Sequence, residues 1–170
     1  MNAIDLLKSQ HREVKDLFAQ IEETDDADDK ASLVQELADN LAAHATIEEK
    51  LFYPAAYGAE TEDLLREAVE EHLAAKRILA DLATMSPKDE NFDAKVKVLN
   101  EQIEHHVEEE ETELFAKAKQ AIGEAQLESL GVQMEELFEE EMDDEPGEKV
   151  VDETAEAAPL QKKSRRGIQA

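Results

Sequence analysis

Residues 37–54 read LADNLAAHATIEEKLFYP and place two polar residues on an otherwise apolar helical stripe. Leu37 and Leu41 lie four residues apart, which is the spacing of neighbours on one face of an α-helix. His44 and Glu48 continue the same face. A buried carboxylate without a partner is strongly disfavoured, so Glu48 is expected to be paired, protonated or bound to a metal. The stretch therefore predicts a core-facing helix that carries ionisable groups into the core.

Three other apolar stripes are interrupted in the same way. His11 lies on the stripe of the first predicted helix, His72 on the third and His106 on the fourth, where Glu110 follows one turn later. A single histidine on an apolar face is usually an ordinary core residue, but four of the five histidines share this placement. No arginine on these stripes could pair with the glutamates, and Lys76 is a single cation for two acids. The pattern favours a metal centre.

The composition favours helices along the whole chain. Charged residues make up 36% of the sequence and aromatic residues only 4%, which suits helices better than sheets. We expect an all-α protein, an up-down four-helix bundle with a short fifth helix. The helices are expected at about residues 2–23, 29–53, 62–84, 86–121 and 124–142. Asn2 is expected to cap the first helix, Ser86 and Pro87 to begin the fourth, and Pro54 to make the end of the second irregular.

Two regions differ in composition. Residues 1–143 carry the helical periodicity and are expected to form the helical bundle, with the metal site within residues 1–120. Residues 144–170 are rich in Pro, Gly, Ala and Glu and end in the basic cluster Lys162, Lys163, Arg165 and Arg166. Such a segment has little apolar surface to bury, so we expect a disordered tail.

Composition also excludes several classes of function. The net charge of −26 repels nucleic acids and anionic lipids, so neither is an expected partner. Cysteine is absent, which excludes disulfides, zinc–thiolate sites and iron–sulfur clusters. The N-terminus lacks the basic start and apolar run of a signal peptide, and no stretch reaches the roughly 18 apolar residues of a membrane span. A cytoplasmic location is expected.

A metal in this chain must therefore be held by nitrogen and oxygen. Four histidines and two glutamates are too many ligands for one four-coordinate zinc, and they favour two iron ions, with manganese as the nearest competitor. Ligands that converge from facing helices are how helical bundles build dinuclear sites. The two carboxylates could bridge the ions and leave room for an oxo or hydroxo group.

The order of these residues resembles the hemerythrin family, in its HHE cation-binding-domain branch. The resemblance covers about residues 1–120 and rests on His11-Arg12-Glu13, the stretch 44–54, Glu71-His72 and the stretch 106–115. It implies a non-haem di-iron protein. By resemblance, the metal ligands are His11, His44, Glu48, His72, His106 and Glu110.

Two positions depart from the oxygen-carrying members of that family. The carriers place the last carboxylate five residues after its histidine, which would select Glu111, whereas the apolar stripe favours Glu110. His105 with Glu109 keeps the HxxxE spacing but points away from the stripe. The carriers have a second histidine where this chain has Lys76, so one iron has a vacancy or another ligand. A phenolate from Tyr53 could fill that position.

Two functions follow from the resemblance. The first is a redox-active protein that binds or reacts with dioxygen, peroxide or nitric oxide, including catalase-like decomposition of peroxide. The alternative is a non-enzymatic module that senses or stores oxygen or iron. Nothing in the sequence decides whether the protein is an enzyme, and no nucleophile triad, phosphate loop or nucleotide fingerprint supports another enzyme class.

Overall fold

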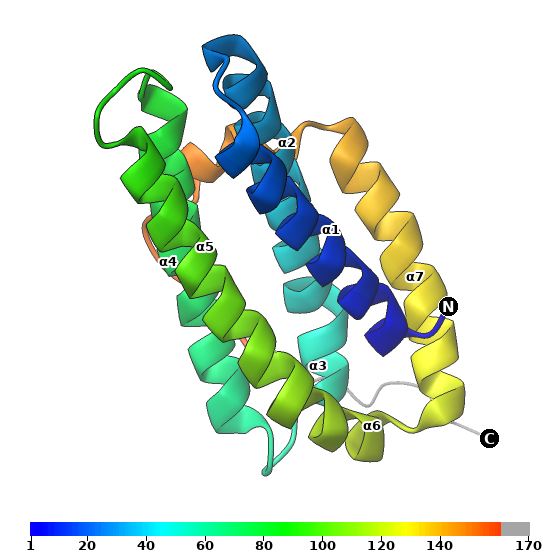
Figure 1. Ribbon diagram of the computed structural model, residues 1–170. Helices are drawn as coiled ribbons and strands as arrows, with labels where there is room; N and C mark the ends of the chain where they lie inside the picture. Colours follow the sequence, from blue (N-terminus) through cyan, green and yellow to red (C-terminus); the bar gives the residue numbers. More distant parts are fainter. Residues whose placement is uncertain (161–170) are drawn as a thin grey trace, which may run out of the picture.

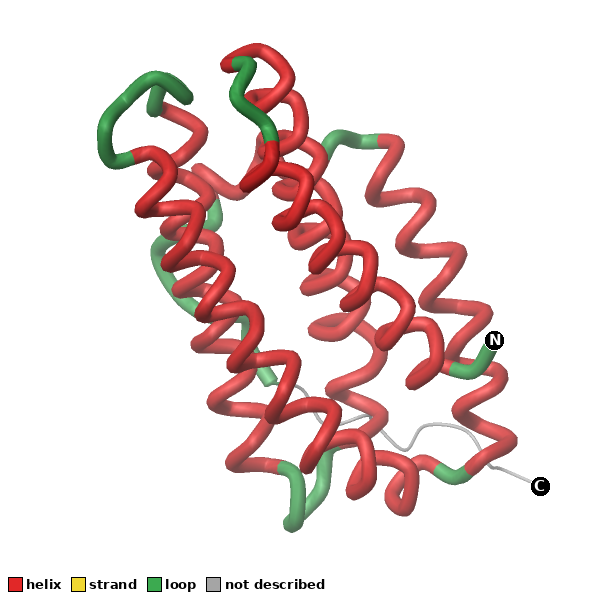
Figure 2. The backbone as a smooth tube through the Cα atoms, viewed as in Figure 1, coloured by secondary structure: helices red, strands yellow, loops and turns green. Residues whose placement is uncertain are grey.

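The computed structural model describes residues 1–160, and these form a bundle of helices (Figure 1). Four long helices run alternately up and down: α1 (Ala3–Glu23), α2 (Ala27–Ile47), α4 (Glu62–Thr84) and α5 (Phe92–Glu109). Helix α1 packs on α2, and α4 packs on α5. Figure 2 shows only helices and loops in the described part of the chain. The expected all-α bundle is confirmed.

Side-chain caps explain where the first two helices begin. The Asn2 carboxamide accepts the N–H of Asp5 at 3.0 Å, as expected for a cap of α1. Asp26 accepts the N–H groups of Asp28 and Asp29, so α2 begins at Ala27, slightly earlier than the sequence predicted. These caps fix the start of each helix and hence its rotation relative to the core.

Two of the long helices continue through π-helical turns. Helix α2 runs into the π turn Glu48–Phe52 and then into α3 (Tyr53–Ala56). Helix α5 runs into the π turn Glu110–Leu114 and then into α6 (Phe115–Ile122). Pro54 is the second residue of α3, directly after the π turn, and its missing N–H interrupts the regular helical hydrogen bonds there. The irregularity expected near Pro54 is thus a π turn, and the chain stays helical to Ala56.

The expected start of the fourth helix at Ser86 is wrong. Ser86 forms a local turn, in which its hydroxyl accepts the N–H of Lys88. Asp89 accepts the N–H of Asn91 in a second turn, and α5 begins only at Phe92, which is buried. Serine and aspartate stabilise turns through the same hydrogen bonds that cap helices, so sequence alone did not separate the two.

The fifth helix, α7 (Glu124–Asp143), lies along α1 and α2 (Figure 1). It buries Leu127, Leu130 and Met134 in the core. Gly131 allows a close approach, because a Cβ at this position would overlap the backbone of Met1 and Ala3. A fifth helix beside the bundle was expected from the sequence. Among residues 1–160, no helix is both long and apolar enough to cross a membrane.

The beginning of the expected tail packs on the bundle. Residues Pro146–Asp152 form a 3₁₀ helix against α2 and α4. Val150 is fully buried, Gly147 N–H donates to Asp39 Oδ1 at 2.8 Å, and Arg77 donates to two backbone carbonyls at residues 154–155. This differs from the expectation of disorder from residue 144 onwards. The reason is that a few specific contacts hold a segment whose average composition is polar. The basic cluster expected at the end of the tail lies outside the described residues.

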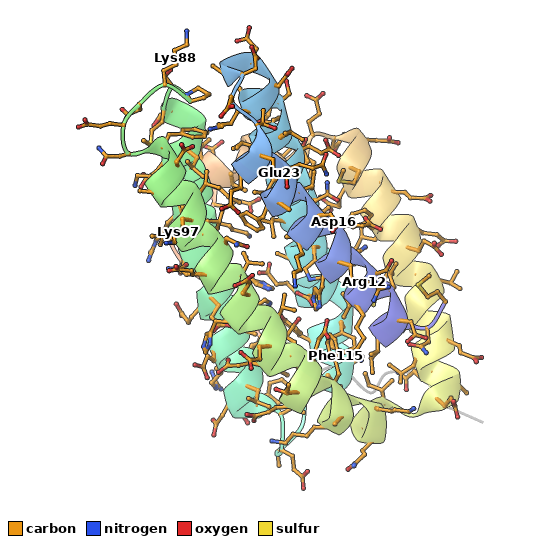
Figure 3. The ribbon with its side chains drawn as sticks, in the orientation of Figure 1. Arg12, Asp16, Glu23, Lys88, Lys97 and Phe115 are labelled. Atoms are coloured by element: carbon orange, nitrogen blue, oxygen red, sulfur yellow. The ribbon has the colours of Figure 1, made fainter. Side chains whose placement is uncertain are left out.

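The core consists of two apolar clusters along the bundle axis, while charged side chains such as Arg12, Asp16 and Glu23 lie on the outer side of α1 (Figure 3). One cluster contains Leu7 and Leu65, and the other contains Val14 and Leu79. In α1 the two clusters are separated by the turn that carries His11. A polar layer therefore divides the core, and it consists of the residues that interrupted the apolar stripes.

Candidate metal centre

All six sequence-predicted ligands lie in this polar layer, and all six are buried: His11, His44, Glu48, His72, His106 and Glu110. Each long helix contributes one histidine, and the two helices with π turns also contribute the glutamates. Glu48 and Glu110 are each the first residue of a π turn. π turns inside α-helices are frequently found at functional sites.

The polar layer contains two overlapping groups of ligand atoms. His11, His44, Glu48 and Glu110 offer one atom each within 4.8 Å of one another, and so do Glu48, His72 and His106. Glu48 is shared by both groups. Its Oε1 lies 3.2 Å from His44 Nε2, and its Oε2 lies 3.2 Å from His72 Nε2. One carboxylate thus faces both halves of the layer.

Glu110 also lies between the halves. Its Oε2 is 3.4 Å from His11 Nε2 and 3.6 Å from His106 Nε2. Glu111 instead lies at the edge of the bundle, where its carboxylate accepts the Nδ1–H of His11 at 2.8 Å. The structure therefore puts Glu110 inside the layer and gives Glu111 a different partner.

The other three histidines are oriented from outside the layer in the same way as His11. Each Nδ1 is bonded to an outer oxygen at 2.7–2.8 Å: His44 to Gln10, His72 to Glu49 and His106 to Glu71. A carboxylate or carbonyl oxygen can only accept, so each Nδ1 carries the proton. In the neutral imidazole, the inward Nε2 then has a free lone pair. This arrangement of an inner nitrogen and an outer acceptor is typical of metal-binding histidines.

The outer partners form a ring around the bundle. Each is the sequence neighbour of an inner residue, and each holds the histidine of the next helix. Gln10 on α1 reaches α2, Glu49 after α2 reaches α4, Glu71 on α4 reaches α5, and Glu111 after α5 returns to α1. Adjacent helical residues are about 100° apart, so the neighbour of a core residue points to the adjoining helix. These contacts were not predicted from the sequence.

A cation fits the layer because several buried atoms have no other partner. Within residues 1–160, His11 Nε2, His44 Nε2, Glu48 Oε1 and Glu110 Oε2 are buried and make no well-aligned hydrogen bond, although His44 faces Glu48 at 3.2 Å and His11 faces Glu110 at 3.4 Å. His72 Nε2 and His106 Nε2 lie 3.2 Å apart. If both rings were neutral and protonated at Nδ1, two lone pairs would face each other at that distance, so this arrangement needs either a proton or a metal ion between the nitrogens. Metal ions in each group would satisfy all these atoms.

The sequence profile of the Hemerythrin HHE cation binding domain matches residues 2–118. The chain belongs to this family. The matched HHE domain spans the four long helices and both π turns, while α7 and the 3₁₀ segment follow it.

The chain is similar to a protein of known structure and to a longer named protein. A crystal structure of a hemerythrin HHE cation-binding domain-containing protein from Mycobacterium kansasii superposes with a TM-score of 0.76 and is 27% identical, covering 85% of this chain and 89% of the other. A protein named DNA nickase from Nostoc sp. is 28% identical over 128 residues, which is 75% of this chain but 36% of the relative. The chain thus spans about a third of the Nostoc protein.

Tyr53 joins the polar layer of the HHE domain from the first turn of α3. Its hydroxyl lies 2.8 Å from Glu110 Oε1, 3.2 Å from Glu48 Oε2 and 3.3 Å from His72 Nε2. The side chain is fully buried. Burial, followed by the charges of Glu110 and Glu48, raises the pKa of Tyr53 well above its usual value, so without a metal the group is a phenol.

The buried charges of the metal-free domain stabilise one another. Burial raises the pKa of Glu48, but His44 and then His72 outweigh it and hold that pKa well below its usual range. Burial lowers the pKa of His72, but hydrogen bonds and charges from Glu48 and Glu49 outweigh it and raise the pKa to about 10. The pKa of His11 is raised in the same way, with Glu110 as the main opposing cause. Protons thus occupy positions that metal ions would take.

A third group of potential ligands lies outside the bundle. Glu67 and Glu71 on α4 face His105 and Glu109 on α5. The His105 side chain is 60% exposed, in agreement with its position off the apolar stripe. Exposed acidic groups of this kind are common without a bound ion, and only Glu71 connects them to the buried layer, through His106.

Proposed function

We propose that this HHE domain holds two non-haem iron ions in the polar layer and binds or reacts with dioxygen, peroxide or nitric oxide. The observation that carries the proposal is that buried histidine nitrogens and glutamate oxygens converge from four helices, each histidine being fixed by an outer acceptor. Nitrogen and carboxylate ligands without sulfur suit iron, and manganese is the nearest competitor.

The proposed ligands divide into two halves. His11 and His44 would hold one ion, while His72 and His106 would hold the other. Glu48 and Glu110 would be shared, because both lie between the two halves. Tyr53 lies against His72 and would add a phenolate to the second half. This tyrosine stands in for the second histidine that the sequence lacks at position 76.

Bound iron would supply one-electron redox chemistry and Lewis acidity. The residues around it control protons and water. The phenol of Tyr53 donates to Glu110 Oε1 at 2.8 Å, so a proton can be held at either oxygen. The apolar clusters on both sides of the layer exclude bulk water from it.

A small cavity favours a small substrate. It has a volume of about 30 Å³, lies between α2 and α4, and is lined by His44 and His72 together with alkyl side chains such as Leu41 and Leu79. This is enough space for a molecule about the size of water. Dioxygen, nitric oxide and hydrogen peroxide are close to this size, while a wider surface pocket of about 340 Å³ borders the layer at His11 and Glu111.

We keep the prediction that the domain does not bind nucleic acid. The name DNA nickase describes the whole Nostoc protein. About two thirds of that protein has no counterpart in this chain. A net charge of −26 opposes approach to a phosphate backbone. Retardation of labelled DNA by the purified protein at physiological salt would contradict this prediction.

The test of the proposed function is metal analysis of the purified protein, followed by spectroscopy and a peroxide assay. We expect two irons per chain and charge-transfer bands that change when Tyr53 is replaced by Phe. Catalytic loss of hydrogen peroxide, with two molecules giving one dioxygen and two waters, would favour the redox function. A stable and reversible dioxygen adduct would favour the alternative of a sensing or storage module. Zinc alone in protein from iron-replete cells would overturn the proposal.

A further inference from the structure

Residues beyond the matched family domain contact Lys76, which lies one helical turn after the proposed ligand His72. The match ends at residue 118, whereas the C-terminal segment, residues 144–155, lies across α2 and α4. It is fixed by the buried Val150, by Gly147 on Asp39 and by Arg77 on its backbone carbonyls. The segment is therefore docked on the side of the bundle where His72 receives its outer partner.

A lysine connects this segment to His72. Lys76 Nζ lies 2.9 Å from Glu153 Oε2 and 3.9 Å from Glu49 Oε2. The other oxygen of Glu49 accepts the Nδ1–H of His72 at 2.8 Å. The Lys76 and Glu49 side chains are only 15% and 13% exposed, so water screens their interaction less than that of a surface pair. Two ion pairs and one hydrogen bond thus connect Glu153 to His72, the Lys76–Glu49 pair being the longest link at 3.9 Å.

We propose that Lys76 and Glu153 are positioning residues of the metal centre, through which the C-terminal segment sets how strongly His72 donates to its iron. The inference rests on the proposed function. A carboxylate that accepts the Nδ1–H of a histidine raises the basicity of its Nε2. The positive charge of Lys76 partly neutralises the Glu49 carboxylate. Glu153 reduces this effect, because it holds the Lys76 ammonium at 2.9 Å, compared with 3.9 Å from Glu49.

The two residues should act in opposite directions. In Glu153→Gln, Lys76 loses its nearer carboxylate and pairs with Glu49 alone. The Nε2 of His72 then becomes a weaker ligand to iron, and ferric iron is less stabilised. The midpoint potential of the centre should rise, and iron should be lost faster to a chelator. In Lys76→Met, Glu49 keeps its full charge and the potential should fall. A merely structural role, in which either change only loosens the segment, would move both variants in the same direction.

The experiment measures the midpoint potential and the rate of iron loss of the iron-loaded full-length protein. Glu156→Gln is the matched control, because it removes the same charge from an exposed position three residues further on. Glu49→Gln sets the scale, since loss of an outer partner typically weakens metal binding about 10- to 100-fold. Glu153→Gln should show a smaller change in the same direction as Glu49→Gln, and Glu156→Gln should match the parent.

A double substitution separates this route from a through-space effect. In a Glu49→Gln background, Glu153→Gln should no longer shift the potential, because the residue that transmits its effect has lost its charge. An equal shift in both backgrounds, or a Glu153→Gln variant that matches Glu156→Gln, would overturn the inference while the iron content of the parent upholds the proposed function. A parent that takes up no iron would overturn both.

Discussion

At the scale of single residues, adjacent histidines have opposite environments. His106 is buried with Nε2 in the polar layer, whereas the side chain of His105 is largely exposed. We predict that His106→Ala lowers the iron content of the purified protein sharply and that His105→Ala does not. Iron per chain is measured by elemental analysis, with circular dichroism as a check that both variants fold. Equal losses would mean that the buried layer is not the iron site.

A second prediction at this scale concerns the outer ring. Glu71 accepts the Nδ1–H of His106, while Glu67 lies one turn away on the same helix and is exposed. Glu71→Gln should weaken iron binding about tenfold or more, because a neutral amide supports the imidazole less well than a carboxylate. Glu67→Gln removes the same charge from the surface and should bind iron like the parent. Competition with a chelator of known affinity measures both.

The inner residues could be predicted from the sequence, but the outer ones could not. His11 and Glu48 could be predicted because each interrupts an apolar stripe, and such a stripe can be identified from the sequence of a single helix. The contact between Gln10 and His44 depends on how two helices are rotated against each other, which periodicity does not determine. Tyr53 is a partial case. Its sequence position suggested a role, but its place in the layer depends on the π turn before it.

At the scale of elements, the helices followed from apolar periodicity, except that α5 begins after the Ser86 turn and not at Ser86, and the two π turns were not predicted. An inserted π turn leaves apolar residues on both sides of it, so the stripe looks continuous in sequence. The C-terminal 3₁₀ helix was not predicted from the sequence, for a different reason. Its attachment depends on one buried side chain, Val150, and a few backbone hydrogen bonds, in a segment of high charge. Average composition cannot detect such specific contacts.

The valine pair in this segment gives a prediction for the element. Val150 is 0% exposed and its neighbour Val151 is 42% exposed. Val150→Ala should destabilise the protein by about 1.5 kcal/mol or more, because two buried methylene equivalents are lost and a cavity remains. A change of that size lowers the melting temperature by about 3–6 °C in a domain of this length. Val151→Ala should change it little, and equal effects would show that the segment is not docked.

At the scale of the whole molecule, the polar layer divides the hydrophobic core and carries charge even without metal. The raised pKa of His72 means that its contribution to stability is full below the unfolded value of 6.5 and is lost as the pH rises through about 10. The lowered pKa of Glu48 means that its contribution is present above 4.5 and is lost as the pH falls through the folded value. Between pH 4.5 and 6.5 these two groups should therefore contribute most to the free energy of unfolding of the metal-free protein. At higher pH this free energy should fall slowly.

Iron changes this dependence, because it binds the neutral imidazole and must displace the proton of His72. The competition with protons eases as the pH rises towards the folded pKa of about 10. We therefore predict that the increase in melting temperature caused by iron is small near about pH 6 and grows towards about pH 8. The charge of the acidic surface is common to both forms and cancels in the difference. Parallel melting curves of the iron-loaded and metal-free proteins across this range would show that protons and iron do not compete for these side chains, and the histidines would then be ion-paired core residues only.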